Sequence, residues 1–199
     1  MKNNLIKLLI SIALFQHIKA ECKTDYILEI NPLLLINQGI GINAERSLFN
    51  EYSAGLNLEY FMQNPYNTNG VSANRYIYTL APFMRYYFLT DKMFGPFLGT
   101  KLNITYSQSI ISDSNTSAQS NVFFIAPIIQ AGYRFISEIG FTLSAYIGIG
   151  FKSKNNSFDT NEFPSSKLDN QDWKNANEKL NKDVSQIQPD YGSTLGFIF

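Results

Sequence analysis

The end of the chain alternates between an apolar and a polar face and closes on an aromatic residue. From Ile187 to Phe199 the odd positions are mostly apolar, and the even positions are polar or glycine apart from Ile198. A period of two places successive side chains on opposite faces of a β-strand. The chain therefore finishes with a two-faced strand, and this pattern constrains what the preceding residues can form.

Seven further segments show the same alternation, and they hold most of the 28 Phe and Tyr residues. No comparable helical periodicity occurs before residue 165. The predicted strands are Tyr26–Asn37, Ile40–Glu45, Ser53–Met62, Arg75–Phe88, Pro96–Ser107, Asn121–Phe135, Phe141–Ser153 and the segment from Ile187.

The charged residues of these segments all lie on the polar face. They include Glu29, Glu45, Glu59, Arg85, Lys101, Arg134, Lys152 and Asp190. Lys or Arg facing lipid at mid-membrane costs about 2–4 kcal/mol, so an uncharged face is what a bilayer selects. Aromatic residues gather at the segment ends, as the girdles of membrane barrels require. We therefore predict an all-β fold, an eight-stranded antiparallel up-and-down transmembrane β-barrel.

Loop lengths alternate in the way that such a barrel requires when both chain ends are periplasmic. The expected short turns are Arg46–Tyr52, Leu89–Gly95 and Ile136–Gly140, and the expected long outward loops are Gln63–Asn74, Gln108–Ser120 and Lys154–Ser185. The first outward turn, predicted at Gln38-Gly39, is too short to follow the rule. Pro32, Pro82, Pro127 and Pro189 fall inside segments and are expected at bulges or strand ends, because proline donates no hydrogen bond.

The N-terminus has the pattern of a secretory signal. Two early lysines precede a short apolar run, and small or apolar residues stand before a cut after Ala20. We therefore divide the chain into a signal peptide (1–20), a short segment (21–25) and a barrel domain (26–199). Loss of residues 1–20 removes three lysines and no acid, which leaves a net charge of −3 and no basic excess for nucleic acid. Cys22 is the only cysteine, so no internal disulfide is expected.

Several stretches carry a resemblance to known proteins. They are Asn31-Pro32-Leu33-Leu34-Leu35, Gly39-Ile40-Gly41-Ile42-Asn43-Ala44-Glu45-Arg46 and Pro82-Phe83-Met84-Arg85-Tyr86-Tyr87-Phe88. Together with the signal, the loop pattern and the terminal Phe, they resemble small eight-stranded bacterial outer-membrane barrels of the OmpA membrane domain and OmpX type, and an uncharacterised outer-membrane barrel family. The resemblance covers about residues 24–199. It implies an architecture, and because this fold serves many roles it says little about function.

The polar face is expected to fill the interior, since eight strands leave just enough room for side chains. The expected lumen charge network balances three acids with three bases: Glu29, Glu45, Glu59, Arg85, Lys101 and Arg134. Buried charges must pair, because an unpaired one costs several kcal/mol. We expect Glu45 to pair with Arg85 and Arg134, and Lys101 to pair with Glu59 or Glu29. A gated, narrow ion path is the alternative to a structural network.

No enzyme is predicted. Small-barrel enzymes resemble this chain in architecture but rely on histidine, and the only histidine, His17, lies in the predicted signal. No His/Cys spacing suited to metal and no Gly-rich phosphate loop appears, so no catalytic residue, metal or cofactor is assigned.

The last long loop contains one helical pattern. Ser166-Lys167-Leu168-Asp169 fits a capping box, and Trp173, Ala176, Leu180 and Val184 follow at helical spacing. We predict a short amphipathic helix that rests on the barrel rim or the lipid interface. The alternative is a contact surface for a receptor, a surface sugar or another protein, with Trp173 and Leu180 as the candidate contacts.

These observations predict a non-enzymatic protein of the bacterial outer membrane, exported by the Sec route, with an envelope-structural and surface-interaction role. Leu195, Phe197 and Phe199 are expected to close the barrel and to act as its C-terminal signal. The expected partners are outer-membrane lipid and the barrel-assembly machinery, and the expected state is a monomer. A narrow porin-like channel and a soluble lipocalin-like carrier are the alternatives.

Overall fold

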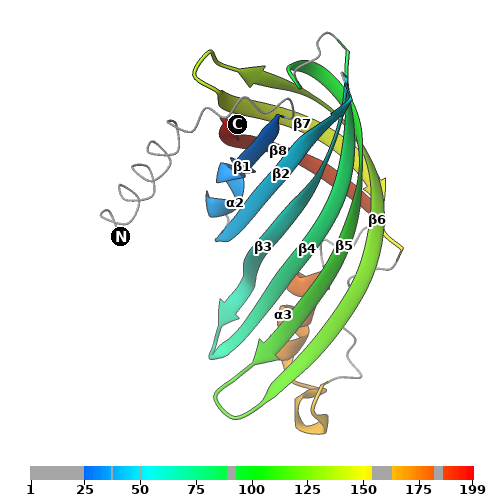
Figure 1. Ribbon diagram of the computed structural model, residues 1–199. Coiled ribbons are helices and arrows are strands. Elements are labelled where there is room, and N and C mark those ends of the chain that lie inside the picture. Colours follow the sequence, from blue (N-terminus) through cyan, green and yellow to red (C-terminus); the bar gives the residue numbers. More distant parts are fainter. Residues whose placement is uncertain (1–24, 37, 50, 89–92, 154–162, 182–185) are drawn as a thin grey trace.

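Eight antiparallel strands close into a ring in the computed structural model, which describes residues 25–36, 38–49, 51–88, 93–153, 163–181 and 186–199 (Figure 1). The predicted signal peptide and Cys22 lie outside the described residues. The elements are β1 (Tyr26–Ile30), α2 (Pro32–Ile36), β2 (Gly39–Phe49), β3 (Tyr52–Thr68), β4 (Val71–Tyr87), β5 (Gly95–Ser112), β6 (Ser117–Ile136), β7 (Phe141–Phe151), η3 (Ser165–Lys167), α3 (Gln171–Asn181) and β8 (Ile187–Ile198).

The ring closes where the last strand meets the first. Leu195 lies opposite Ile30, and Phe197 lies opposite Leu28. Beyond the strand, Phe199 accepts a hydrogen bond from the backbone of Tyr26 at 3.1 Å and donates one back at 2.8 Å. The three residues expected to close the barrel therefore all lie along this seam.

The predicted orientation of the side chains, with the apolar face outside the ring and the polar face inside it, is confirmed. Apolar side chains of every strand lie outside the ring, and Leu28, Leu58, Ile129 and Ile147 are among those left exposed. The alternate positions point inward, where polar and charged side chains make up a large part of the buried interior. This inside-out distribution follows directly from the period of two, because each strand has only two faces. Among the described residues, no helix is long and apolar enough to cross a membrane.

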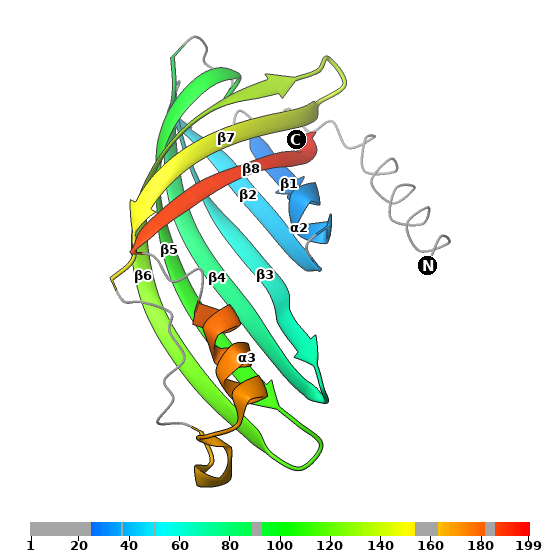
Figure 2. The same ribbon diagram turned by 180° about the vertical axis from the view of Figure 1, so that it is seen from behind.

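Four consecutive strands are much longer than the other four. β3 to β6 run past the end of the ring and form a curved sheet that projects beyond it (Figures 1 and 2). We call residues 62–68, 71–76, 108–112 and 117–121 the sheet extension, because β2 pairs with β3 only as far as Phe61. The predicted long loops Gln63–Asn74 and Gln108–Ser120 were therefore wrong.

Tight turns replace those two loops. Asn69 and Gly70 both have positive φ, at 53° and 75°, which is the geometry of a two-residue hairpin turn. In the next hairpin, Asp113 accepts hydrogen bonds from the backbone of Asn115 and Thr116, each at 2.9 Å. The polar residues at both places are turn residues of long hairpins and not parts of open loops.

The first predicted strand, Tyr26–Asn37, is also corrected. The strand stops at Ile30, and Pro32 begins the short helix α2. Proline suits the first helical position because the backbone N–H that it lacks has no partner there. Asn31 caps the helix through its side-chain oxygen, which accepts a hydrogen bond from the backbone of Leu33 at 3.1 Å. The connection between β1 and β2 is therefore a helical turn inside the ring mouth and not a two-residue turn at Gln38-Gly39.

The other prolines lie where a strand lacks one neighbour. β7 pairs with β6 only from Ile128, one residue after Pro127. Pro189 pairs with β7, whereas the pairing of β8 with β1 begins only at Leu195. At Pro82 the regular pairing of β4 with β5 is interrupted. Each proline thus occupies a position where the sheet needs no hydrogen bond from it on one side.

Candidate functional site

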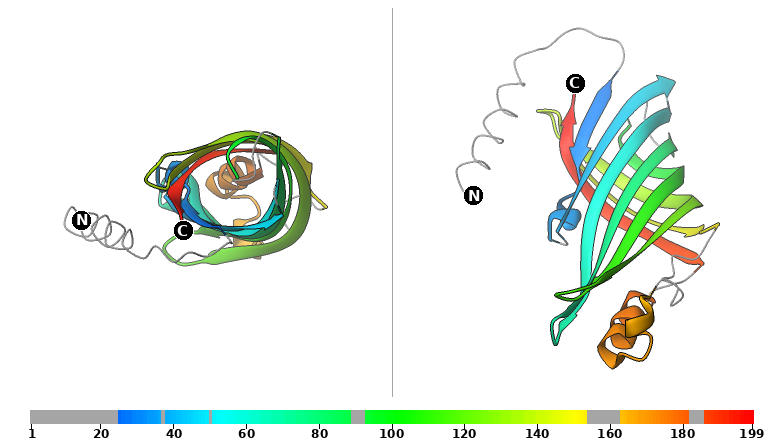
Figure 3. Two further views of the ribbon diagram at one scale, coloured as in Figure 1. Left: turned by 45° about the horizontal axis from the view of Figure 1, so that its top comes forward. Right: turned by 90° about the horizontal axis from the view of Figure 1, so that it is seen from below.

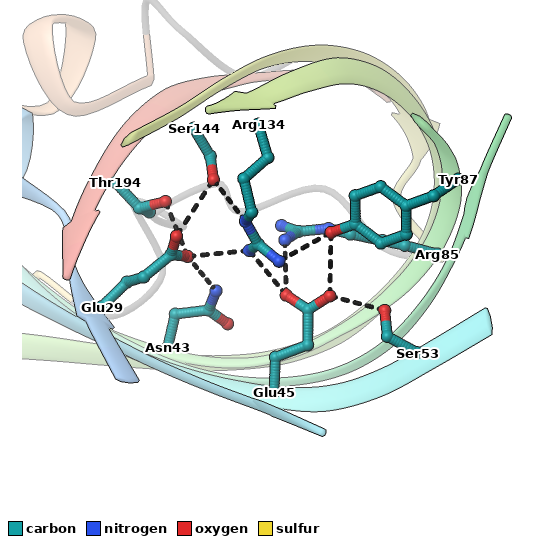
Figure 4. Close-up of polar contacts among 9 residues, drawn as sticks. All are labelled: Glu29, Asn43, Glu45, Ser53, Arg85, Tyr87, Arg134, Ser144 and Thr194. Carbon is teal, nitrogen blue, oxygen red and sulfur yellow. Dashed lines mark hydrogen bonds and ion pairs between the residues drawn. The ribbon is translucent and has the colours of Figure 1, made fainter. Parts of the chain in front are cut away.

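Four buried charges form a compact cluster inside the ring, near the end where β1 begins and β8 ends (Figure 4). We call Glu29, Glu45, Arg85 and Arg134 the charged cluster. Arg134 lies 3.0 Å from Glu29 and 2.7 Å from Glu45, and Arg85 lies 2.7 Å from the same oxygen of Glu45. The pairing expected for Glu45 with both arginines is present. The expectation that Glu29 could pair with Lys101 is wrong, because Glu29 belongs to this cluster.

Neutral side chains complete the coordination of both carboxylates. Glu29 accepts hydrogen bonds from Asn43, Ser144 and Thr194. Glu45 accepts hydrogen bonds from Ser53 and Tyr87. These donors come from strands on all sides of the ring, and Figure 4 shows them converging on the two carboxylates.

The charged cluster is almost fully removed from water. The side chains of Glu29, Glu45 and Arg134 are 0% exposed and that of Arg85 is 4% exposed. Charges at this depth are tolerated only when they are paired and hydrogen-bonded. Two acids and two bases cancel, so the cluster is a neutral polar core.

Aromatic rings seal the interior around the cluster. The guanidinium of Arg85 lies 4.5 Å from the ring centroid of Phe83 and 4.6 Å from that of Phe97, a cation–π arrangement. Phe97 also belongs to a buried apolar group whose other members are Ile27, Tyr87, Met93 and Tyr146. Within the described residues, this layer fills the ring at the level of the cluster.

The remaining predicted network residues lie farther along the ring. Lys101 forms an ion pair with Asp190 at 2.7 Å, so the expected pairing of Lys101 with Glu59 or Glu29 was wrong. Glu59 is half-buried and accepts a hydrogen bond from Asn57 at 2.9 Å. The sequence pattern places Asp190 on the polar face. It lies 89 positions after Lys101 along the chain, and the two side chains meet only because the strands close into a ring.

A cavity of about 820 Å³ lies beyond the Lys101–Asp190 pair. We call it the outward cavity, and its wall is formed by the inner faces of β3 to β6 and β8 together with α2 and α3. Apolar residues of α2 line one part of it, and polar residues including Asn103, Gln188 and Asp190 line another. No sequence motif marks this cavity, because it depends on α2 folding into the ring mouth.

The predicted amphipathic helix is present as α3, and it lies against the inner face of the sheet extension (Figures 2 and 3). Trp173 is 0% exposed and Leu180 is 1% exposed, in a cluster with residues of the extension such as Val71 and Ile111. Their assignment as candidate surface contacts was therefore wrong. Val184 lies outside the described residues.

Polar contacts fix the docked position of α3. Arg75 donates a hydrogen bond to the carbonyl of Leu180 at 2.7 Å. Trp173 donates its indole N–H to Asp113 at 3.1 Å, and Lys167 forms an ion pair with the same carboxylate. These contacts hold the pKa of Asp113 well below its usual range, chiefly through the hydrogen bond from Lys167.

The start of α3 differs from the expected capping box. Ser166 and Lys167 belong to the 3₁₀ turn η3, and the helix begins at Gln171. Asn170 caps it by accepting hydrogen bonds from the backbone of Asp172 at 3.0 Å and of Trp173 at 3.2 Å. Asparagine is a preferred N-cap residue, but the capping-box pattern at Ser166-Lys167-Leu168-Asp169 predicted an earlier start of the helix.

No metal site is evident in the part of the chain that the structure describes, where no three His, Cys, Asp or Glu side chains come together. The buried carboxylates of Glu29 and Glu45 are instead each held by arginine. A carboxylate engaged in this way is poorly placed to exchange protons with a substrate.

Residues 6–182 match the model of a family described as "Protein of unknown function (DUF3575)". The chain belongs to this family. No curated protein matches the chain. The fold of this DUF3575 member is similar to a crystal structure of Ail, the attachment invasion locus protein of Yersinia pestis, in complex with the heparin analogue sucrose octasulfate. The TM-score is 0.52 at 10% identity, over 89% of this chain and 100% of that chain.

Two further solved structures resemble the chain. A second structure of Ail from Yersinia pestis has a TM-score of 0.49 at 10% identity, over 88% of this chain and 97% of that chain. A major outer membrane protein from Thermus thermophilus has a TM-score of 0.48 at 9% identity, over 89% of this chain and 100% of that chain. The likeness to the first Ail structure concerns the fold, a closed antiparallel barrel of eight strands.

Proposed function

We propose that this protein is a monomeric, non-enzymatic barrel of the bacterial outer membrane. In this proposal it stabilises the envelope and contacts the surroundings of the cell through its sheet extension. Outer-membrane lipid surrounds it, and the barrel-assembly machinery inserts it after Sec-type export. One observation carries the proposal, namely an uncharged apolar band on the outside of the ring that is bounded by two rows of aromatic side chains.

The upper row lies at the base of the sheet extension. Direct register pairs join Tyr60 to Tyr78, Tyr78 to Tyr106, and Tyr106 to Phe123 across four neighbouring strands. The first two pairs bring ring centroids within 5.1 Å and 6.2 Å. A row of amphipathic rings at one level is typical of a membrane–water interface.

The lower row lies near the end where β1 begins and β8 ends. Its members on described strands and turns include Tyr26, Tyr52, Tyr86, Phe94, Tyr133, Phe135, Phe141 and Phe197. Phe123 and Tyr133 are ten positions apart on β6. At about 3.3 Å per residue and a tilt of about 40°, the two rows are separated by about 25 Å, which is the height of the apolar band of membrane barrels.

Charge on the exterior agrees with these boundaries. Among the described residues of the ring, the outward-facing positions between the rows carry no Lys, Arg, Asp or Glu. Arg46 faces outward at the lower row, where its guanidinium lies 5.3 Å from the ring centroid of Tyr26. A long basic side chain at this depth reaches the interface. Beyond the upper row the outer face becomes polar, with Gln119 and Asn121 exposed.

The interior supports a structural role over a pore. The charged cluster and the aromatic layer beside it occupy the ring, and ion conduction would require them to separate. Breaking a buried ion pair costs about 3–5 kcal/mol, which opposes frequent opening. A soluble carrier is disfavoured because it would expose the whole apolar band to water.

Cell fractionation and gel mobility test the proposal. We expect the protein in the outer-membrane fraction, extracted only by detergent, and we expect a different mobility for unheated and heated samples. Recovery of the folded protein in the periplasm without detergent would refute it. In planar bilayers we expect no defined conductance steps, and regular steps would establish the channel alternative in place of the closed barrel.

A further inference from the structure

We infer that the outward cavity binds an uncharged, hydroxyl-bearing amphiphile, of which a short-chain alkyl glycoside is the simplest representative. This inference goes beyond the proposed envelope role and assigns a ligand site to a part of the ring that the charged cluster does not fill. It rests on the size of the cavity, on its apolar wall, on unsatisfied acceptors in its polar wall, and on its charge.

The size and depth of the cavity suit a small ligand. Its volume of about 820 Å³ lies within the range of about 300–1,000 Å³ that is typical of ligand pockets. The charged cluster lies between the cavity and the end of the ring where β1 begins and β8 ends, so the cavity is closed on that side. A ligand therefore enters from the opposite end of the ring, where α2, α3 and the sheet extension lie.

The apolar wall is provided by α2. This helix has the sequence Pro-Leu-Leu-Leu-Ile and buries none of its residues, and Ile36 is 78% exposed. Leu33, Leu34 and Ile36 line the cavity. Gly41 lies beneath α2, where an added methyl would come within 2.7 Å of Leu34. Apolar side chains kept inside a polar ring, and not turned toward the exterior, are a surface suited to a short hydrocarbon chain.

Three acceptor oxygens in the polar wall receive no hydrogen bond. Asn103, Gln188 and Asp190 each carry a buried side-chain oxygen that accepts no hydrogen bond in the structure. Asn103 is only 4% exposed. Unsatisfied buried acceptors cost free energy, and a ligand that brings hydroxyl donors relieves that cost. Such a ligand offers an apolar chain to α2 and a group of hydroxyls to these oxygens.

Charge selects an uncharged ligand over an ionic one. Asp190 is already paired with Lys101 at 2.7 Å, so an ammonium group would be placed beside an existing cation. Lys152 and Lys179 also line the cavity, which further disfavours a cationic ligand. An anionic group would be attracted by the same lysines, but it donates no hydrogen bond to the three acceptor oxygens and is repelled by the carboxylate of Asp190. A neutral hydroxylated group meets neither obstacle.

Isothermal titration calorimetry on the whole mature chain in lipid nanodiscs tests the inference. The probes are hexyl β-glucoside, hexyl sulfate and hexylammonium, which share one alkyl chain, and empty nanodiscs measure partition into lipid. We expect saturable binding of one glucoside per chain, and binding of the sulfate and the ammonium at least about tenfold weaker. No saturable glucoside signal above empty discs, or equal or tighter binding of either ion, would overturn the inference.

Three variants locate the site. Gln188→Leu removes a polar-wall residue and is expected to weaken glucoside binding about three- to tenfold. Ile36→Ser removes apolar contact and is expected to weaken it about tenfold. Gln119→Leu makes the same change on the exposed outer face of β6 and should leave binding unchanged. Equal binding by the Gln188 and Gln119 variants would refute the site, whereas heat-dependent gel mobility separately reports whether each barrel is folded.

Discussion

Replacement of Arg134 by methionine is expected to lower the free energy of unfolding by about 3–5 kcal/mol, the usual cost of leaving a buried charge without its partner. Arg134 lies 3.0 Å from Glu29 and 2.7 Å from Glu45, and its side chain is 0% exposed. Glu45 keeps Arg85 as a partner in the variant. Glu29 keeps only neutral hydrogen-bond donors, so the cluster gains one uncompensated negative charge.

Urea unfolding in lipid vesicles, followed by gel mobility of unheated samples, measures this loss. With a urea dependence of about 2 kcal/mol per molar, a loss of about 3–5 kcal/mol lowers the midpoint by about 1.5–2.5 M. The double variant Arg134→Met with Glu29→Gln restores neutrality and should recover most of the loss. The control is Arg46→Met, which removes an arginine from the exposed exterior and should change stability by less than about 0.5 kcal/mol.

Two results would contradict this account of the interior. One is an Arg134→Met midpoint within error of the wild-type value, since that would mean that water or a rearranged base compensates Glu29. The other is a double variant as unstable as the single one, since that would assign the loss to packing and not to charge. The double-mutant cycle separates the two contributions.

Three further outcomes are expected. Trp173→Ala should release α3, because truncation of a buried Trp costs about 3–5 kcal/mol, and trypsin cleavage within α3 should rise about 100-fold or more. Lys167 holds the pKa of Asp113 low, so the ionised carboxylate stabilises docking of α3 fully above about pH 4, and this stabilisation is lost as the pH falls further. The loss should appear as a red shift of the tryptophan emission at low pH, and Asp113→Asn should remove this pH dependence. Gly196→Ala should abolish the heat-modifiable form, because the added methyl overlaps the backbone of β1, whereas Gly192→Ala meets only the hydroxyl end of the Tyr146 ring and no backbone atom, and should retain it.

The alternation of apolar and polar residues was enough to predict the ring and the direction of most side chains. It was enough because the exterior band is uniformly apolar, so that the same rule holds on every strand. Strand ends were predicted poorly for the same reason. Above the upper aromatic row the apolar and polar residues exchange faces. There Val71, Ala73 and Ile111 face inward against α3, and polar residues face outward. Because the outer face is no longer apolar there, the sequence pattern predicted strands that end too early in β3 to β6.

The interior contacts could be predicted only in part. Glu45 could be placed with Arg85 and Arg134 because all three lie near the same end of their strands. The partner of Lys101 could not, since Asp190 is 89 positions away and the relative height of the two depends on the stagger of the closed ring. The burial of Trp173 was missed because it requires the sheet extension, which the loop interpretation had removed.

The distribution of the charged cluster along the chain bears on how the molecule is made. Glu29 and Glu45 are synthesised first, Arg134 follows after most of the sheet, and Thr194 arrives with the last strand. In the proposed membrane setting, an insertion intermediate that ends before β6 would hold Glu29 and Glu45 against Arg85 alone and would carry surplus negative charge into hydrocarbon, at a cost of several kcal/mol. An intermediate that lacks only β7 and β8 would leave Glu29 without its hydrogen bonds from Ser144 and Thr194, so the buried cluster favours the complete barrel over partly built ones.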